Sequence, residues 1–343
     1  MKALIYQNNS IKFREKENPK IQSSRDAIVK VKLSSICTSD LHIIRGAVPQ
    51  AKEGIVLGHE FVGEIVELGD GIKNLKIGDR VSSNCETFCG ECYFCKRGFI
   101  NNCEHGGWML GCKIDGCQAE YIRVPFADTG LTKLPENVTY EKALFVGDIL
   151  SSGYFGAELC EIKENDTIAV IGAGPVGLCA MASAKTFLAG KIIAIDIDSY
   201  RLETAKKLNL ADYIFNPTEC NIETEIKKLT SNRGADGVIE CAGSNSSFEM
   251  SWKIARPNSI VAVVAMYEEN QILPLPQMYG KNLIFKTGGV DAVHCKTLLD
   301  MISKGILNTD FLISKTFKLD EIEQAYKYFE NKTDNCLKVA IEY

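Results

Sequence analysis

The chain has 343 residues, of which 45% are hydrophobic and 24% charged, and its formal net charge is -5. This composition is typical of a globular protein with two or three domains. The sequence has no basic stretch interleaved with aromatic residues, which argues against a nucleic-acid partner. The uncharged run 168–184 falls short of the about 20 residues that a membrane-spanning helix needs, and a Gly-Pro turn interrupts it.

The first 145 or so residues are predicted to be rich in strands. Residues 27–33, AIVKVKL, alternate apolar and charged side chains as a half-buried strand does. The segment 60–83 is predicted to form strands separated by glycine turns. Residues 118–125 predict a further strand. The apolar run at the N-terminus is too short for an export signal, so we expect a cytoplasmic protein. Because the cytoplasm is reducing, we expect the 14 cysteines to serve as thiols or metal ligands and not as disulfides.

Four of these cysteines lie within 15 residues, in the spacing C-x2-C-x2-C-x7-C: Cys89, Cys92, Cys95 and Cys103. Iron–sulfur ligation and free thiols are alternatives, but bacterial ferredoxins place the fourth cysteine three residues after the third, before a proline. A closed tetrahedral zinc site fits the longer loop better. Because all four ligands come from the protein, this zinc is predicted to be structural and to hold a lobe at about 85–112.

From about residue 165 the pattern alternates strand and helix. Buried strands separated by helices predict a parallel, doubly wound sheet, and hence an α/β fold with a second, β-rich domain. The tail contains a predicted helix near 291–304, a strand near 311–318, a helix near 320–330 and a last strand. It is too small for a domain, and we expect it to complete the first one. The predicted domains are therefore 1–149 with 289–343, and 150–288.

The sequence IAVIGAGPVG carries a dinucleotide-binding fingerprint between a predicted strand and a predicted helix. Gly172 permits the tight turn, Gly174 lets the backbone approach a pyrophosphate, and Gly177 lets the helix pack on the strand. Pro175 and Val176 complete this loop, whose helix N-terminus faces the phosphate charge.

Asp196 ends the second strand of this domain, 19 residues after the last glycine of the fingerprint. A carboxylate there accepts hydrogen bonds from ribose hydroxyls and repels a 2′-phosphate, which favours NAD over NADP. Arg201 offers a cation that would act in the opposite sense, unless it is simply an exposed helix residue. Ala265 and Gly288 are predicted to lie at strand ends where the nicotinamide would bind. A methyltransferase could share the glycine loop and the acid.

A second metal site is indicated by CTSDLH at 37–42 and GHEFVGEIVELG at 58–69. Cys37 and His59 offer a thiolate and an imidazole. The third ligand of a catalytic zinc, which keeps one position open, would be Glu60 or a more distant acid.

These motifs, with GDRV, the four-cysteine lobe and GAGPVG in the same order, resemble the zinc-dependent medium-chain alcohol dehydrogenases. The segment GDILSSGYFGAEL at 147–159 is similar to bacterial secondary-alcohol dehydrogenases, in which an aspartate replaces the third cysteine ligand. The resemblance thus assigns that role to Asp148. The best-known clostridial members of that group lack the structural-zinc cysteines and use NADP, so this chain looks like an NAD-using relative with two zinc ions.

The resemblance implies a GroES-like catalytic domain, a Rossmann dinucleotide-binding domain, a homodimer or homotetramer, and a small alcohol or ketone as substrate. It implies that Ser39 accepts the alcohol proton and passes it by way of ribose hydroxyls to His42, and so to solvent. Asp40 would orient His59. Trp108 and Leu110 are predicted either to line the substrate pocket or to pack in the core. The alternatives are a polyol, butanediol or threonine-type dehydrogenase, and a non-catalytic sensor that binds zinc and nucleotide.

Overall fold

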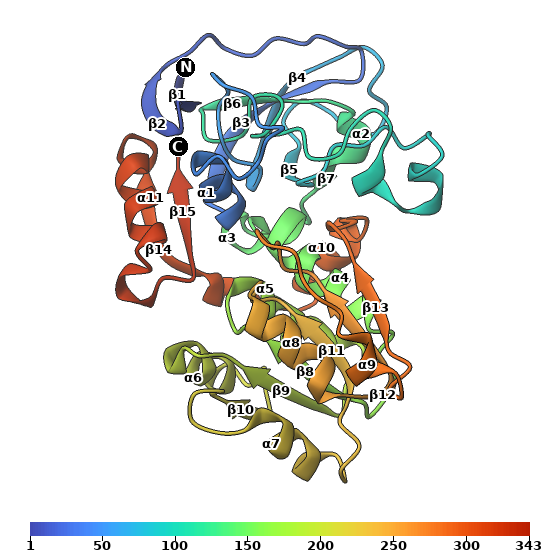
Figure 1. Ribbon diagram of the computed structural model, residues 1–343. Coiled ribbons are helices and arrows are strands. Elements are labelled where there is room, and N and C mark those ends of the chain that lie inside the picture. The colour runs from blue at the N-terminus through green and yellow to red at the C-terminus, as the bar shows by residue number, and fades with distance from the viewer. The chain divides into compact units, whose positions relative to one another are not determined.

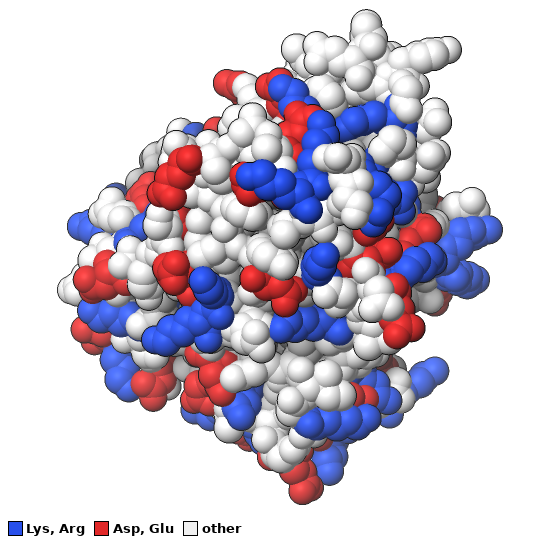
Figure 2. Space-filling model, turned by 90° about the horizontal axis from the view of Figure 1, so that it is seen from below, with Lys and Arg blue, Asp and Glu red and all other residues white.

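The computed structural model describes residues 1–343 and divides into two compact units. The first comprises Met1–Ser151 and Asp291–Tyr343, and the second comprises Ser152–Val290 (Figure 1). No helix is both long and apolar enough to cross a membrane. On the face shown in Figure 2, acidic and basic side chains are intermixed and do not gather into a field of one sign.

The first unit is built on a seven-stranded sheet in the order β14-β15-β3-β4-β5-β7, with β6 pairing β3. An N-terminal antiparallel hairpin, which the sequence pattern does not predict, joins β1 to β2. The strands of this unit are β1 (Lys2–Gln7), β2 (Ser10–Glu15), β3 (Ala27–Ser35), β4 (Phe61–Leu68), β5 (Arg80–Ser83), β6 (Tyr121–Val124), β7 (Leu131–Lys133), β14 (Ile313–Lys318) and β15 (Lys338–Glu342).

The C-terminal tail returns to this first sheet, as the sequence predicts. β15 lies between β14, to which it is parallel, and β3, to which it is antiparallel. In Figure 1 the red tail accordingly lies against the blue N-terminal strands. β15 itself is almost wholly buried, because a strand inside a sheet has neighbouring strands along both edges.

Helices and helical turns of the first unit connect and cover these strands. They are α1 (Thr38–Ile44), η1 (Cys95–Arg97), η2 (Ile100–Asn102), α2 (Ala127–Gly130), α3 (Tyr140–Ala143), the π-helical turn η3 (Val146–Leu150), α10 (Cys295–Ser303), η4 (Asp310–Leu312), η5 (Leu319–Glu321), α11 (Ile322–Glu330) and η6 (Thr333–Asn335). The helix expected near 291–304 thus begins at Cys295.

The second unit is the parallel, doubly wound sheet that the alternation of strand and helix predicts. Its order is β10-β9-β8-β11-β12-β13. The strands are β8 (Thr167–Ile171), β9 (Lys191–Ile195), β10 (Tyr213–Phe215), β11 (Ala235–Glu240), β12 (Ala255–Val263) and β13 (Ile284–Thr287), and the helices are α4 (Ser151–Leu159), α5 (Pro175–Thr186), α6 (Ser199–Lys207), α7 (Ile222–Leu229), α8 (Asn245–Ile254) and α9 (Leu275–Met278).

The carboxyl ends of the strands of this sheet are aligned. Ile171 pairs with Ile195 and with Glu240, Glu240 pairs with Val263, and Val263 pairs with Thr287. The loops that follow these residues therefore leave the sheet along one edge, where ligands of open α/β sheets bind.

Candidate active site

Three potential metal ligands from distant parts of the sequence meet in the first unit. The donor atoms of Cys37, His59 and Asp148 all lie within 4.8 Å of one another. Asp148 Oδ2 is 3.6 Å from Cys37 Sγ and 3.2 Å from His59 Nε2. Cys37 precedes α1, His59 precedes β4, and Asp148 lies in the π-helical turn η3. The backbone thus brings a thiol, an imidazole and a carboxylate to one point.

Charges around the three donors bias their protonation. Burial favours neutral His59, but the charge of Asp40 and the hydrogen bond with Asp148 hold the pKa of the imidazole well above its usual value. Burial opposes ionisation of Asp148, yet the hydrogen bond and charge of His59 lower the pKa of its carboxyl. Burial and the charge of Asp148 raise the pKa of the Cys37 thiol.

Asp40 and Ser39 contact His59 on its two ring nitrogens. Asp40 Oδ1 lies 3.5 Å from Nδ1, and Ser39 Oγ lies 3.3 Å from Nε2. Both side chains come from the first turn of α1, next to Cys37. His42 lies on the same helix, half-buried and three residues after Ser39.

Glu60 lies outside this donor group although it follows His59 directly. Its carboxylate accepts a hydrogen bond from Lys338 Nζ, which also donates to Ile36 O at 2.6 Å. Lys338 is only 1% exposed and Glu60 2%. Burial raises the pKa of Glu60 to about 7, although the charge of Lys338 opposes this shift.

The chemistry of the three donors fits a zinc ion. Thiolate, imidazole and carboxylate are the ligands of catalytic zinc, and three protein ligands leave a fourth position open. The far nitrogen of His59 faces a carboxylate, as metal-bound histidines usually require. These features indicate a catalytic, not a structural, metal site.

The four cysteines of the lobe form a second donor group, with Sγ atoms within 4.8 Å of one another. Backbone N–H groups point at the sulfurs: Cys92 N lies 3.4 Å from Cys89 Sγ, and His105 N lies 3.4 Å from Cys103 Sγ. Such donors stabilise thiolates. Four thiolates at this separation fit a closed structural zinc site with no open position.

The glycine fingerprint lies where the aligned edge of the second unit predicts it, between β8 and α5. Gly172 has φ +92°, and a Cβ on Gly177 would lie 1.7 Å from Gly172 O, so only glycine fits there. Pro175 begins α5, followed by Val176. The N-terminus of this helix is open to an anion at the edge of the sheet.

Asp196 and Arg201 lie beside this glycine loop. Asp196 Oδ2 accepts a hydrogen bond from Ala173 N at 2.6 Å. Arg201 pairs with Asp198 at 3.6 Å, and its Nη1 lies 3.4 Å from the position that a Cβ on Gly174 would occupy. Asp198 caps α6, as a residue with a short side-chain acceptor does.

Ala265 and Gly288 follow the neighbouring strands at the same edge. Ala265 N donates to Glu240 O at 3.3 Å. Gly288 comes directly after Thr287, the last residue of β13. The residues predicted to bind the dinucleotide therefore lie in the loops and first helical turns that follow the carboxyl ends of strands in this sheet.

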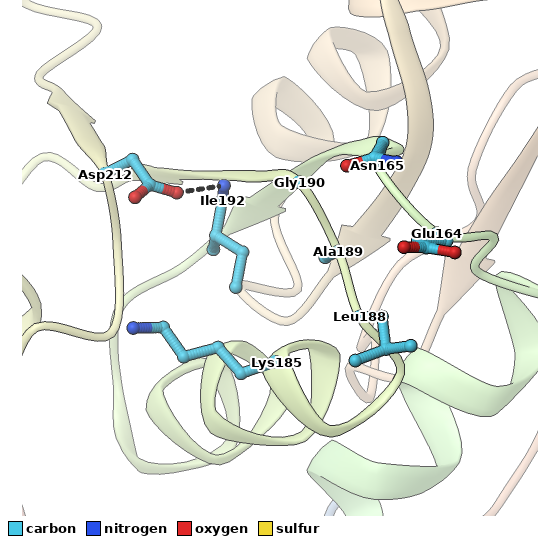
Figure 3. Close-up of a pocket in the computed structure, with 8 residues that line it drawn as sticks. All are labelled: Glu164, Asn165, Lys185, Leu188, Ala189, Gly190, Ile192 and Asp212. Atoms are coloured by element: carbon cyan, nitrogen blue, oxygen red, sulfur yellow. Dashed lines mark hydrogen bonds between the residues drawn. The ribbon is translucent and has the colours of Figure 1, made fainter.

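A pocket of about 390 Å³ lies at the opposite, amino-terminal ends of the strands of the second unit. Figure 3 shows Lys185 and Leu188 on one side and Asp212, which accepts a hydrogen bond from Ile192 N, on the other. The pocket is far along these strands from the residues of the glycine fingerprint, so it is not part of the candidate site.

Trp108 and Leu110 have different surroundings. The Trp108 ring is half-buried and lies edge-on to His59, with centroids 6.0 Å apart. Leu110 is fully buried in the core with Phe61 and Val81. Leu110 therefore packs in the core, which was one of its two predicted roles.

Three buried residues that support the donor group were not predicted from the sequence. They are Lys338, Gln118 and Tyr326, which are all buried. A lysine in a short apolar strand, KVAIE, could have suggested a buried ion pair, but its partner could not be read from the sequence.

This chain is similar to known proteins along its whole length. Residues 23–136 match the alcohol dehydrogenase GroES-like domain, and residues 175–303 match the zinc-binding dehydrogenase family. An alcohol dehydrogenase from Cupriavidus necator is 35% identical, covering 100% of this chain and 98% of its own. An NADP-dependent isopropanol dehydrogenase from Thermoanaerobacter brockii is 33% identical, covering 95% of each. The solved structure of the alcohol dehydrogenase from Thermus sp. ATN1 has a TM-score of 0.93 and 35% identity, covering 100% of this chain and 99% of that one.

A GroES-like β domain, a Rossmann sheet and zinc-type donor groups define a zinc-binding oxidoreductase that uses a nicotinamide cofactor. The chain belongs to the zinc-dependent medium-chain alcohol dehydrogenase family. It is an enzyme that interconverts an alcohol and a carbonyl compound.

Proposed function

We propose that this enzyme oxidises a short-chain secondary alcohol to a ketone, and reduces the ketone, with NAD as cofactor and two zinc ions per chain. The observation that carries the proposal is the meeting of Cys37, His59 and Asp148. The substrate class is supported by the isopropanol dehydrogenase relative from Thermoanaerobacter brockii.

In this proposal Cys37, His59 and Asp148 hold the catalytic zinc, and the four cysteines of the lobe hold the structural one. When bound, the catalytic zinc supplies a Lewis acid that lowers the pKa of the alcohol oxygen. Glu60 remains paired with Lys338 and balances its buried charge.

Residues around the zinc take up the proton of the substrate hydroxyl and pass it on. Ser39 Oγ, which is 3.3 Å from His59 Nε2, accepts the proton of the substrate hydroxyl and releases its own hydroxyl proton toward His42. His42 lies one turn further along α1 and passes that proton toward solvent. Asp40 holds the proton of His59 on Nδ1, so that Nε2 keeps its lone pair for the metal. The edge of the Trp108 ring borders the substrate.

A nicotinamide cofactor bound to the second unit would supply the acceptor for the hydride of the alcohol carbon. The glycine loop would hold its pyrophosphate, and Ala265 and Gly288 would lie beside its nicotinamide. Asp196 accepts hydrogen bonds from the ribose hydroxyls and repels a 2′-phosphate. Arg201 is already paired with Asp198, which reduces its attraction for a phosphate. These contacts support NAD, in contrast to the NADP-dependent relative.

The test is turnover by the zinc-loaded protein, followed through the absorbance of the reduced nicotinamide. We expect activity on 2-propanol or 2-butanol with a higher kcat/KM for NAD than for NADP. Cys37→Ala should remove one zinc and lower kcat/KM by at least about a hundredfold, since a metal Lewis acid contributes several kcal/mol. Cys112→Ala, which removes a buried thiol outside both donor groups, is the matched control.

Full activity of Cys37→Ala would contradict the assignment of the catalytic metal. A preference for NADP would contradict the role of Asp196 alone. If the zinc-loaded protein binds NAD but turns over no alcohol, the alternative of a non-catalytic sensor that binds zinc and nucleotide would be favoured.

A further inference from the structure

A row of buried polar side chains runs from the C-terminal tail to the zinc ligand His59. Tyr326 OH lies 2.7 Å from Gln118 Oε1, Gln118 Nε2 lies 3.3 Å from Asp40 Oδ2, and Asp40 Oδ1 lies 3.5 Å from His59 Nδ1. Tyr326 is on α11, Gln118 precedes β6, and Asp40 is on α1. All these residues belong to the first unit.

The directions of the Tyr326–Gln118 and Gln118–Asp40 hydrogen bonds are fixed by chemistry. An amide oxygen only accepts, so Tyr326 donates its hydroxyl proton to Gln118 Oε1. The Gln118 amide is thereby oriented with Nε2 toward Asp40, and its N–H donates to the carboxylate. Burial and the charge of Asp40 hold the pKa of Tyr326 well above its usual value, so the phenol keeps the proton that it donates.

The carboxylate of Asp40 is held by its other oxygen. Oδ2 accepts from Cys37 N at 2.9 Å as well as from Gln118. Two donors on Oδ2 leave Oδ1 directed at His59 Nδ1. Without the phenol, only the contacts of Nε2 with Asp40 and with Ser35 O, at 3.4 Å, orient the Gln118 amide. A turn of its oxygen toward Asp40 would set two acceptors face to face.

The backbone around Gln118 is built for this contact. Gln118 N donates to Leu57 O and Gln118 O accepts from Leu4 N, both at 2.9 Å. Gly58, just before His59, has φ +93°, and a Cβ there would lie 2.7 Å from Gln118 Cγ. A glycine at this position therefore lets the glutamine side chain pass beside the histidine loop.

We propose that Tyr326 and Gln118 are positioning residues, which hold Asp40 so that His59 presents Nε2 to the catalytic zinc. This inference rests on the proposed function, because it requires that Cys37, His59 and Asp148 bind the metal. It extends the site from α1 to the C-terminal helix α11, and neither residue touches the substrate.

The test is zinc retention by the zinc-loaded full chain during titration with a chelator. Tyr326→Phe should weaken the catalytic zinc by about tenfold, the lower end of the effect of outer partners of metal ligands. The zinc of the four cysteines should be retained and serves as internal reference. Tyr328→Phe removes a hydroxyl from the same helix, where it contacts Asp334, and should match the wild type.

A double-mutant cycle separates positioning from a general loss of stability. In an Asp40→Asn background, Tyr326→Phe should have no further effect on zinc retention, because the two residues act through one contact. Gln118→Met, which keeps the side-chain volume, should reproduce Tyr326→Phe. Zinc retention equal to that of Tyr328→Phe, or effects that add in the cycle, would overturn the inference. Wild-type protein that holds only the four-cysteine zinc would instead overturn the proposed function on which it rests.

Discussion

Glu86 is a buried carboxyl group whose Oε2 has no hydrogen-bond partner. It is 7% exposed, and burial raises its pKa to about 8 from an ordinary value of 4.5. The folded state therefore holds a proton that the unfolded chain has already released, and this group lowers stability as the pH rises from 4.5 to about 8.

Glu86→Gln removes that penalty. Between about pH 6 and about pH 8, the free energy of unfolding of the variant should improve relative to the wild type by about 2 to 3 kcal/mol, at about 1.4 kcal/mol per pH unit. Urea unfolding at the two pH values measures this change. Glu17→Gln, at an exposed position, should show no such change. A difference between Glu86→Gln and wild type that is constant with pH would contradict the prediction.

At the scale of residues, the sequence predicts the metal ligands better than the buried residues that hold them in place. Cys37 and His59 stand out as metal ligands by their type, and the resemblance to a family adds Asp148. Lys338 and Tyr326 could not be predicted, because their contacts with Glu60 and Gln118 depend on how distant segments pair. Only the fold brings residues about 200 or more positions apart into hydrogen-bond distance.

At the scale of elements, the turn between β8 and α5 depends on one close approach. A methyl group at Gly177 would collide with Gly172 O, so Gly177→Ala should displace the start of α5. Because the N-terminus of this helix binds the pyrophosphate in our proposal, the variant should bind NAD at least about tenfold more weakly. Calorimetric titration measures the affinity. Gly280→Ala, where a Cβ meets nothing within 4 Å, is the control, and equal affinities for the two variants would contradict the prediction.

The elements of the second unit follow from the sequence because buried parallel strands and their helices have distinct periods. The first unit is harder to predict. The hairpin of β1 and β2 has no strong turn dipeptide, and Asn8 and Asn9 form its turn with φ +52° at both positions. The π-helical turn at Val146–Leu150 has no sequence period of its own, although it carries Asp148.

At the scale of the whole molecule, β13 is an edge strand of the second unit, and large apolar side chains are exposed near it. Tyr279 is 89% exposed and Ile272 80%. Unpaired strand edges and apolar patches favour association, so we propose that copies of this chain associate through this edge. Tyr279→Glu should shift the mass measured by light scattering toward the monomer. Ile77→Glu, at an exposed site of the first unit, should not, and an unchanged mass for Tyr279→Glu would argue against this edge.

The position of β15 has a consequence for the order in which the protein forms. This strand lies inside the first sheet and carries Lys338, the partner of Glu60. A ribosome synthesises it only after the whole of Ser152–Val290, which is continuous in the chain. The dinucleotide-binding unit can therefore fold while the chain is still growing. Until β15 is synthesised, the sheet that supports the metal ligands lacks a strand that pairs with β3. The first unit is therefore completed after the second, although its synthesis begins first.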